Sequence, residues 1–339
     1  MIIVMRPDAT PEQLERVCEM VSRIGFEARP VHGQQTTVVG IVGNDSPIEA
    51  GPFQALPGVA RTIPISSPFK QVSWEWQNES TVVELPNGTR FGGGHKGLIA
   101  GPCSVETEEQ IHAAAAGVAA AGGTVLRGGA YKPRTSPYSF QGVGRDALVW
   151  MRAAADAHGL CVVTEAVDPG SAELVAEHAD MIQLGARNMQ NYALLSVVGT
   201  LGKPVLLKRG MAATIKEWLL AAEYIVKAGC ADVVLCERGI RSFDGMTRNV
   251  LDLGGMVAAK QRTHLPVVAD PSHGTGRRNM VRALSRAAIA AGADGLIVEA
   301  HPNPDEAWSD GAQSLTLEEL AVLKAEVDVV AKAVAGLEG

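Results

Sequence analysis

Short apolar segments alternate with helix-length segments eight times between residue 97 and the end of the chain, and this alternation constrains the fold more than any other feature. The segments between the apolar runs are rich in Ala and Leu. Repeated strand-helix units of this kind predict a parallel sheet. Eight in succession predict a closed (β/α)8 barrel, an α/β fold whose active site lies at the carboxyl ends of the strands. The predicted strands are residues 98–100, 125–127, 161–164, 181–183, 205–208, 233–236, 267–269 and 296–299.

Cationic side chains recur where four of these predicted strands end. They are Arg127, Lys132 and Arg134 at the second strand, Arg187 at the fourth, Lys208 at the fifth and Arg238 at the sixth. Arginine offers a planar fork of donors that matches phosphate oxygens, and lysine adds a compact charge. The hydroxyls of Thr135 and Ser136 can complete the shell. An isolated basic loop is usually only solvated, but cations after strand upon strand predict a site for phosphate groups.

A second group of side chains follows the predicted first, seventh and eighth strands, which are neighbours in a closed barrel. The group is Cys103, His273, Glu299 and Asp310. Taken singly, a Cys at a strand end is more often a small core residue. Together, a thiolate, an imidazole and two carboxylates suit one divalent metal ion such as Zn²⁺, Fe²⁺ or Mn²⁺. His301 is the alternative imidazole donor, and we place it second, as a group behind the ligands.

Six motifs carry a resemblance to a known family. They are Gly101-Pro102-Cys103-Ser104, residues 132–142, Gly185-Ala186-Arg187-Asn188, Lys208-Arg209-Gly210, Cys236-Glu237-Arg238-Gly239 and Asp270-Pro271-Ser272-His273. In this order they resemble the 3-deoxy-D-arabino-heptulosonate 7-phosphate (DAHP) synthases, in the short type-I subgroup with a small domain in front. The resemblance implies condensation of phosphoenolpyruvate with erythrose 4-phosphate, with release of phosphate, at the start of the shikimate pathway. It also implies an essential divalent metal ion.

The resemblance further implies a role for each matching residue. The residues at the phosphoenolpyruvate site are Arg127 and Lys208 for the carboxylate and Arg187 and Arg238 for the phosphate. The residues at the erythrose 4-phosphate site are Arg134 and Thr135, with Ser136 as a helper and Lys132 between the two substrates. The candidates for proton transfer are Lys132, Glu165 and His273. The sequence does not apportion the proton transfers among them.

Charge and composition exclude several other classes of protein. The chain has a formal net charge of −7, so the cations at the strand ends form a local positive site that attracts anions. No basic stripe interleaved with aromatic residues occurs, which argues against a nucleic-acid partner. No apolar run approaches the ~20 residues of a membrane span. The first residues lack the features of a signal peptide, and the five scattered cysteines indicate a reduced, cytoplasmic protein.

Residues 1–67 follow a different pattern, which predicts a small ferredoxin-like domain. Expected strands at residues 2–5, 26–31, 37–42 and 59–65, with a helix at about 10–24 and a weaker helix at 47–56 that Gly51-Pro52 interrupts, give the order βαββαβ. Residues 68–96 are expected to form a linker and a hairpin that plugs the amino end of the barrel, and residues 97–339 the catalytic barrel. In the resembling subgroup the front domain serves feedback inhibition, which implies a homotetramer regulated by tyrosine or phenylalanine.

Two alternative functions remain open. A sister synthase condenses phosphoenolpyruvate with arabinose 5-phosphate, making 3-deoxy-octulosonate 8-phosphate, and shares the barrel and much of the phosphoenolpyruvate site. That enzyme has Asn-Arg-Ser-Ser after an alanine, whereas this chain has Pro133-Arg134-Thr135-Ser136. The second alternative is an amino-acid-sensing protein with an inactive barrel. The intact metal and phosphate groups argue against it.

Overall fold

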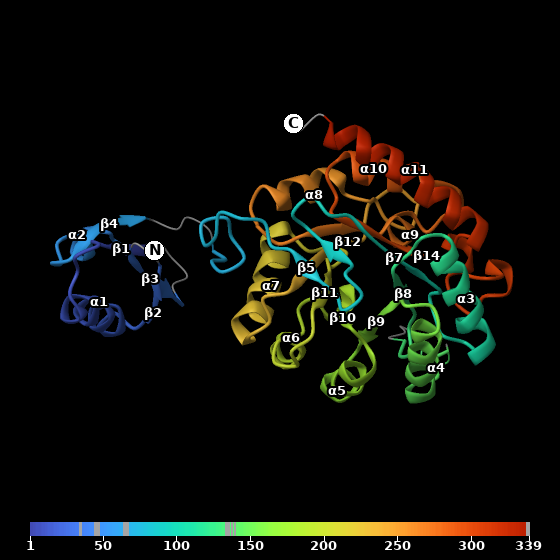
Figure 1. Cartoon of the computed structure of the whole chain (residues 1–339), viewed down its shortest axis with the longest axis horizontal. Coiled ribbons are helices and arrows are strands. Elements are labelled where there is room, and N and C mark those ends of the chain that lie inside the picture. The colour runs from blue at the N-terminus through green and yellow to red at the C-terminus, as the bar shows by residue number, and fades with distance from the viewer. Residues whose placement is uncertain are drawn as a thin grey trace. The chain divides into compact units, whose positions relative to one another are not determined.

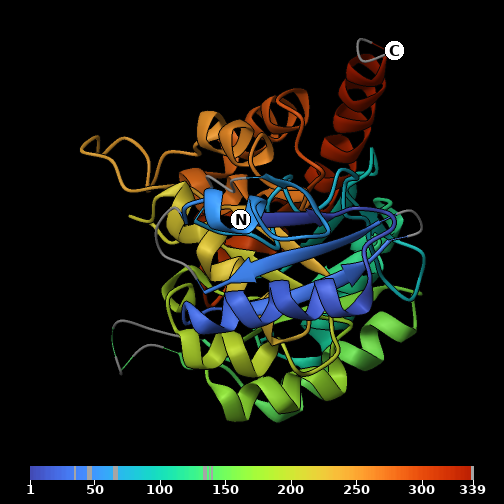
Figure 2. The same ribbon diagram turned by 90° about the vertical axis from the view of Figure 1, so that its left-hand side faces the viewer.

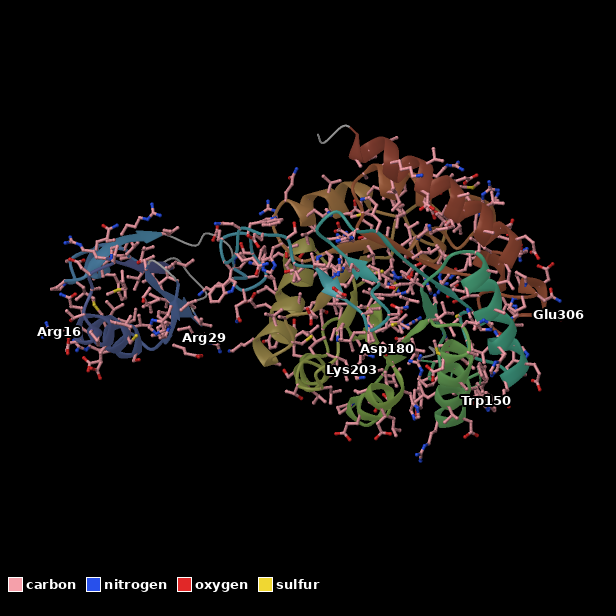
Figure 3. The ribbon with its side chains drawn as sticks, in the orientation of Figure 1. Arg16, Arg29, Trp150, Asp180, Lys203 and Glu306 are labelled. Atoms are coloured by element: carbon pink, nitrogen blue, oxygen red, sulfur yellow. The ribbon has the colours of Figure 1, made fainter. Side chains whose placement is uncertain are left out.

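A computed structural model describes residues 1–33, 36–43, 48–63, 68–132, 136, 138 and 140–336 of the 339-residue chain. The chain folds into two compact units, Met1–Trp76 and Gln77–Gly339 (Figure 1), and each has its own hydrophobic core. Charged side chains such as Arg16 in the first unit and Glu306 in the second lie on the outside (Figure 3). In the described part of the chain, no helix is both long and apolar enough to cross a membrane.

Eight parallel strands form a closed barrel in the second unit, as the sequence predicts (Figure 1). The strands are β7 (Gly97–Gly101), β8 (Val125–Arg127), β9 (Cys161–Ala166), β10 (Met181–Leu184), β11 (Val205–Lys208), β12 (Val233–Glu237), β13 (Val267–Ala269) and β14 (Gly295–Glu299). The barrel closes where the last strand meets the first, because β14 pairs in parallel with β7 from Gly295↔Gly97 to Glu299↔Gly101. All eight strand ends therefore face one rim, where βα-loops place side chains.

Helices follow the strands and cover the outside of the barrel (Figure 1). They are α3 (Glu108–Ala120), α4 (Arg145–Asp156), α5 (Pro169–His178), α6 (Tyr192–Val198), α7 (Ile215–Ala228), α8 (Leu253–Lys260), α9 (Pro271–Thr275), α10 (Arg278–Ala290) and α11 (Leu317–Ala335), with 3-10 turns η1 (Ala186–Asn188), η2 (Pro304–Glu306) and η3 (Gly311–Gln313). Capping boxes fix several starts: Thr214 caps α7 with Glu217, and Thr316 caps α11 with Glu319.

A short hairpin packs against the amino ends of the barrel strands. It consists of β5 (Val83–Glu84) and β6 (Arg90–Phe91), which pair antiparallel. Val83 and Phe91 belong to the same buried cluster as side chains from inside the barrel. A Cβ on Gly97 would lie 2.3 Å from the Phe91 ring. Glycine at the start of β7 thus allows the aromatic ring to enter the barrel base.

The first unit is a four-stranded antiparallel sheet in the order β2-β3-β1-β4, the arrangement expected for a ferredoxin-like βαββαβ chain. Its elements are β1 (Ile2–Met5), α1 (Pro11–Arg23), β2 (Glu27–His32), β3 (Thr37–Val42), α2 (Gly51–Gln54) and β4 (Val59–Ile63). Figure 2 shows α1 running alongside the strands. Val17 and Val21 of α1 are fully buried in one cluster with Ile3 and Val39 of the sheet.

The second helix of this unit is much shorter than the sequence analysis predicts. We expected a helix over residues 47–56, whereas α2 spans only Gly51–Gln54, and residue 47 lies outside the described residues. Pro52 occupies the first turn of α2. Proline has no backbone N–H and is tolerated only in the first turn of a helix, so the helix cannot run through it from an earlier start.

Candidate active site

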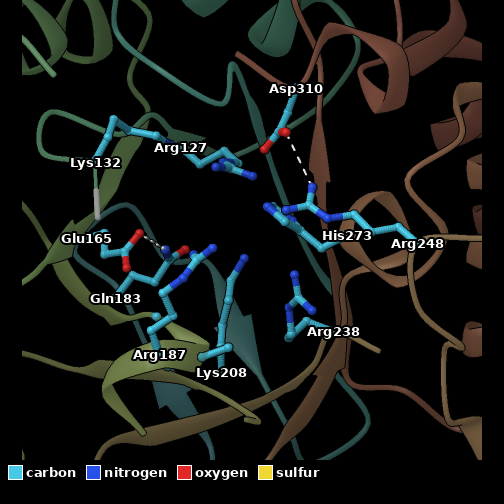
Figure 4. A pocket seen from close by; sticks show the side chains of 12 residues that line it. Arg127, Lys132, Glu165, Gln183, Arg187, Lys208, Arg238, Arg248, His273 and Asp310 are labelled. Atoms are coloured by element: carbon cyan, nitrogen blue, oxygen red, sulfur yellow. Dashed lines mark hydrogen bonds and ion pairs between the residues drawn. The ribbon is translucent and has the colours of Figure 1, made fainter. Parts of the chain in front are cut away.

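A cavity opens where the barrel strands end, and it is lined mainly by charged side chains (Figure 4). Its lining residues are Arg127, Lys132, Glu165, Gln183, Gly185, Ala186, Arg187, Lys208, Arg238, Arg248, His273 and Asp310. They come from the loops or last residues of strands that are far apart in sequence. Barrel topology alone brings them together, as the sequence analysis expected of strand-end residues.

Five of the six cations predicted from the sequence line this cavity. Arg127 and Lys208 are the last residues of β8 and β11, Arg238 follows β12, Arg187 lies in η1 and Lys132 lies in the loop after β8. The sixth, Arg134, lies outside the described residues together with Pro133 and Thr135. Ser136 is described; it is exposed and is not a lining residue.

The cations of the cavity differ in their partners. Arg127 Nη1 donates to Glu299 Oε1 over 3.0 Å, and Lys208 Nζ donates to Asp270 Oδ2 over 2.6 Å. Within the described part of the chain, neither Arg187 nor Arg238 forms an ion pair with a carboxylate. Arg238 is only 5% exposed, and burial lowers its pKa. A buried cation without a counter-charge is costly, so Arg238 favours an anion in the cavity, where the exposed Arg187 adds a second positive charge.

Three of the four predicted metal ligands meet at one point. The Cys103 Sγ and one carboxylate oxygen each of Glu299 and Asp310 all lie within 4.8 Å of one another. The Cys103 thiol donates to Asp310 Oδ2 over 3.4 Å, and Lys132 Nζ lies 3.1 Å from the sulfur. Burial raises the pKa of the Cys103 thiol to about 11, and the Glu299 carboxylate adds to the rise. A thiol and two carboxylates held this close suit a divalent cation, because a bound cation would favour the thiolate.

The fourth predicted ligand, His273, borders this group through Glu299. Its Nε2 lies 3.4 Å from Glu299 Oε1, and its Nδ1 lies 2.7 Å from Asp270 Oδ2. A carboxylate on one ring nitrogen orients the other toward a metal, a common arrangement in metal sites. The donor set therefore fits a divalent ion. His301, the alternative donor, instead faces Glu106, with its Nε2 3.5 Å from Glu106 Oε2.

A glycine explains how the Cys103 loop reaches Arg127. Gly101, the last residue of β7, has a φ of +147°, and a Cβ there would lie 2.1 Å from the carbonyl oxygen of Arg127. Only glycine allows this close approach of β7 to β8. The Gly101-Pro102-Cys103 motif thus brings the thiol to the rim beside Arg127.

The structure adds residues to which the sequence analysis assigned no role. Asp270 is fully buried and binds both Lys208 and His273. Although burial opposes its ionisation, His273 and Lys208 hold the pKa of Asp270 well below its usual range. Arg248 Nη1 lies 3.3 Å from Asp310 Oδ1 (Figure 4), and Gln313 Nε2 donates to Glu299 Oε2 over 2.6 Å. Among these residues, only Asp270 could have been found from the sequence, because it begins the motif that contains His273.

The candidates for proton transfer also line the cavity. Lys132 Nζ donates to the carbonyl oxygen of Cys103 over 2.7 Å, and Glu165 Oε2 lies 3.5 Å from the amide nitrogen of Gln183. Figure 4 shows Lys132 and Glu165 on the same side of the cavity, with His273 across from them. The fold and this cavity define a (β/α)8-barrel protein whose strand-end cavity is lined by cations and borders a group of side chains suited to a metal ion.

Comparison with known proteins gives the family. The model of the DAHP synthetase I family matches residues 79–334, and that of the DAHP synthase ferredoxin-like domain matches residues 1–67. A phospho-2-dehydro-3-deoxyheptonate aldolase of Thermotoga maritima is 47% identical over 98% of both chains. The crystal structure of that aldolase (DAHP synthase) from T. maritima covers 98% of this chain and 97% of its own, with a TM-score of 0.78.

A more distant relative shares only part of the chain. A 2-dehydro-3-deoxyphosphooctonate aldolase of Syntrophotalea carbinolica is 34% identical, over 68% of this chain and 89% of its own length. The protein therefore belongs to the DAHP synthetase I family, with the ferredoxin-like domain of DAHP synthases in front.

Proposed function

We propose that this chain is a metal-dependent DAHP synthase, a transferase that condenses phosphoenolpyruvate with erythrose 4-phosphate to give DAHP and phosphate. This reaction is the first step of the shikimate pathway. The observation that carries the proposal is the 47% identity to the T. maritima enzyme over 98% of both chains. The phosphooctonate aldolase of S. carbinolica is 34% identical over 68% of this chain. The arabinose 5-phosphate reaction is therefore the second candidate.

The cations of the cavity supply the binding groups for both substrates. We assign Arg127 and Lys208 to the phosphoenolpyruvate carboxylate, Arg187 and Arg238 to its phosphate, Arg134, Thr135 and Ser136 to the phosphate of erythrose 4-phosphate, and Lys132 to the space between. Support comes from Arg238, which is buried and forms no ion pair with a carboxylate within the described residues, and from Arg187, which lines the same cavity; a phosphate would neutralise both. Arg127 and Lys208 are held rigid by Glu299 and Asp270, which fixes the orientation of the carboxylate.

Cys103, His273, Glu299 and Asp310 would hold one divalent metal ion such as Mn²⁺, Fe²⁺ or Zn²⁺. When bound, the ion supplies Lewis-acid polarisation of the substrate aldehyde. The enol carbon of phosphoenolpyruvate attacks the aldehyde carbon, water then adds at C2, and the phosphohemiketal collapses with loss of phosphate. Lys132, Glu165 and His273 border the reacting groups and would donate a proton to the new alkoxide and take one from the water.

A turnover assay tests this proposal directly. Phosphate release should occur with phosphoenolpyruvate and erythrose 4-phosphate, and it should stop when a chelator removes the metal. Arabinose 5-phosphate in place of erythrose 4-phosphate should give little or no product. Faster turnover with arabinose 5-phosphate would favour the sister reaction, and no turnover with either aldose would favour an inactive barrel.

The front domain, residues 1–67, is assigned a regulatory role. It would bind tyrosine or phenylalanine where front domains of neighbouring subunits meet in a homotetramer, and closure over the barrel's active site would then inhibit the cytoplasmic enzyme. Residues 68–96 would connect and plug the barrel formed by residues 97–339. Initial rates with added tyrosine, phenylalanine or tryptophan should fall for the full chain and stay constant for a chain that begins at about Pro68. Inhibition of the truncated chain would place the sensor in the barrel.

A further inference from the structure

We infer that Glu106 and the hydroxyl pair Ser104–Ser309 are positioning residues that hold the candidate metal ligands Cys103 and Asp310 side by side. We call these three residues the clamp. The inference rests on the metal site proposed above. In this inference, residues that do not bind the metal ion themselves hold the ligand side chains in the positions that the ion requires.

The clamp joins two loops that are about two hundred residues apart in the sequence. Glu106 Oε1 accepts the backbone N–H of Trp308 over 2.7 Å, with a separation of 202 residues. The hydroxyls of Ser104 and Ser309 lie 2.5 Å apart. Ser104 directly follows Cys103, and Ser309 directly precedes Asp310. Two short hydrogen bonds therefore tie together the two segments that carry the thiol and the carboxylate.

The clamp is buried, so its hydrogen bonds are shielded from water. Ser104 is fully buried, and Glu106 and Ser309 are each 7% exposed. Breaking such a bond leaves a buried polar group without a partner, which is costly. An imidazole borders the other carboxylate oxygen of Glu106. The Nδ1 of His301 accepts the backbone N–H of Asn303 over 3.0 Å, which places the ring proton on Nε2, 3.5 Å from Glu106 Oε2.

The backbone of Asp310 explains why a clamp is needed. Asp310 has φ 52° and ψ 27°, and it is the one non-glycine residue with a positive φ in the described part of the chain. The left-handed region is disfavoured for residues with a Cβ, although Asp tolerates it better than most. Hydrogen bonds on both sides of Asp310 hold its backbone in this conformation. The preceding residue, Ser309, is hydrogen-bonded to Ser104, and the hydroxyl of Ser314, which follows in the chain, donates to the Asp310 carbonyl oxygen over 3.1 Å.

Glu106 acts through the loop and not as a ligand. In the described residues, the group whose atoms converge for a metal ion contains Cys103, Glu299 and Asp310, and Glu106 is not part of it. The Glu106 carboxylate contacts a backbone N–H and an imidazole. Loss of this carboxylate should leave all four ligand side chains present but free the loop that aims Asp310 at Cys103.

Metal affinity measured apart from activity tests the inference. Glu106→Ala should raise the Kd for Mn²⁺ roughly tenfold, the lower end of the effect usual for groups behind metal ligands, and Ser309→Ala should raise it less. The Kd is measured on metal-stripped protein by competition with a coloured chelator. Glu106→Gln should keep most of the affinity, because its amide oxygen can still accept the Trp308 N–H. Phosphoenolpyruvate affinity of the metal-free protein should not change.

Asp294→Ala is the matched control. Asp294 is also 7% exposed and also accepts a backbone N–H, that of Val267 over 2.8 Å, but at the amino end of β13. The Asp294→Ala replacement should lower the melting temperature of the protein and leave its Kd for Mn²⁺ unchanged. If the parent protein binds Mn²⁺ and Glu106→Ala and Ser309→Ala bind it equally well, the clamp is wrong and the metal site stands. If the parent does not bind Mn²⁺, the proposed metal site and the clamp both fail. Should Glu106→Ala not fold, Ser309→Ala alone decides.

Discussion

Replacing Asp270 with Asn should destabilise the barrel by about 3–5 kcal/mol, the usual cost of removing one partner from a buried ion pair. Asp270 is fully buried and Lys208 is 4% exposed. After the replacement, Lys208 would remain buried as a cation without the carboxylate that pairs with it. Asn can still cap α9 through the backbone N–H of His273, so the loss reports mainly the missing charge.

The distance sets the scale of the effect. At the observed 2.6 Å, the gross attraction between the two charges is about 6 kcal/mol with an effective dielectric constant of about 20. Part of this attraction offsets the cost of taking both charges out of water. The expected loss is therefore smaller than the gross attraction but several times that of a surface pair.

Urea unfolding near neutral pH, followed by the tryptophan fluorescence to which the buried Trp218 contributes, measures the change. Lys324–Asp328 is the matched control, because it is also a Lys–Asp pair but exposed, and Asp328→Asn should change the midpoint little. The double variant Lys208→Met with Asp270→Asn should lose less than the sum of the single variants, since neither charge is left unpaired. A loss below about 1 kcal/mol for Asp270→Asn, or simple additivity, would refute the reasoning.

Three further outcomes are expected. Cys103→Ser should weaken metal binding sharply, because the thiolate is the only soft ligand, and an unchanged Kd for Zn²⁺ by chelator competition would contradict this. Arg238→Ala should raise KM for phosphoenolpyruvate more than for erythrose 4-phosphate, and Arg134→Ala the reverse; equal effects on both KM values would reject the assignment. Burial raises the pKa of Glu237 above its ordinary value, and Arg209 limits this rise. In Arg209→Met the pKa of Glu237 should rise further, so the stability lost relative to the parent should grow as the pH rises above the folded-state pKa that Glu237 has in the parent. Urea midpoints of variant and parent across pH measure this loss, and a loss that shrinks with pH would contradict it.

The barrel could be predicted from the sequence because strand and helix lengths alternate without interruption. Each of the eight expected strands lies within an observed one, and closure follows once eight parallel strands are present. The structure of the first unit was harder to predict from the sequence. Its order of elements was predicted, but the second helix was extended over residues 47–56 despite the interruption recognised at Gly51-Pro52. A single proline in a ten-residue segment sets where the helix begins, even when the rest of the segment favours a longer helix.

The residues of the candidate site also fall into those that could be predicted from the sequence and those that could not. Arg127, Lys208 and Arg238 could be placed because topology fixes where strand-end residues point. Arg248 and Glu106 could not, because their roles arise from contacts between loops with no shared sequence pattern: Arg248 meets Asp310 62 residues away, and Glu106 meets Trp308 202 residues away. Strand periodicity carries no information on which loops touch.

His273 lies between two carboxylates, and each of these also holds a cation of the proposed phosphoenolpyruvate carboxylate site. Glu299 Oε1 is 3.4 Å from the ring and 3.0 Å from Arg127, while Asp270 Oδ2 is 2.7 Å from the ring and 2.6 Å from Lys208. A divalent ion bound to Glu299 would draw that charge away from Arg127, which leaves the guanidinium freer to attract the substrate carboxylate. Because linkage is reciprocal, bound phosphoenolpyruvate must then tighten the metal by the same factor. Glu299, which the proposed metal and phosphoenolpyruvate sites share, would thus couple the two sites through its charge.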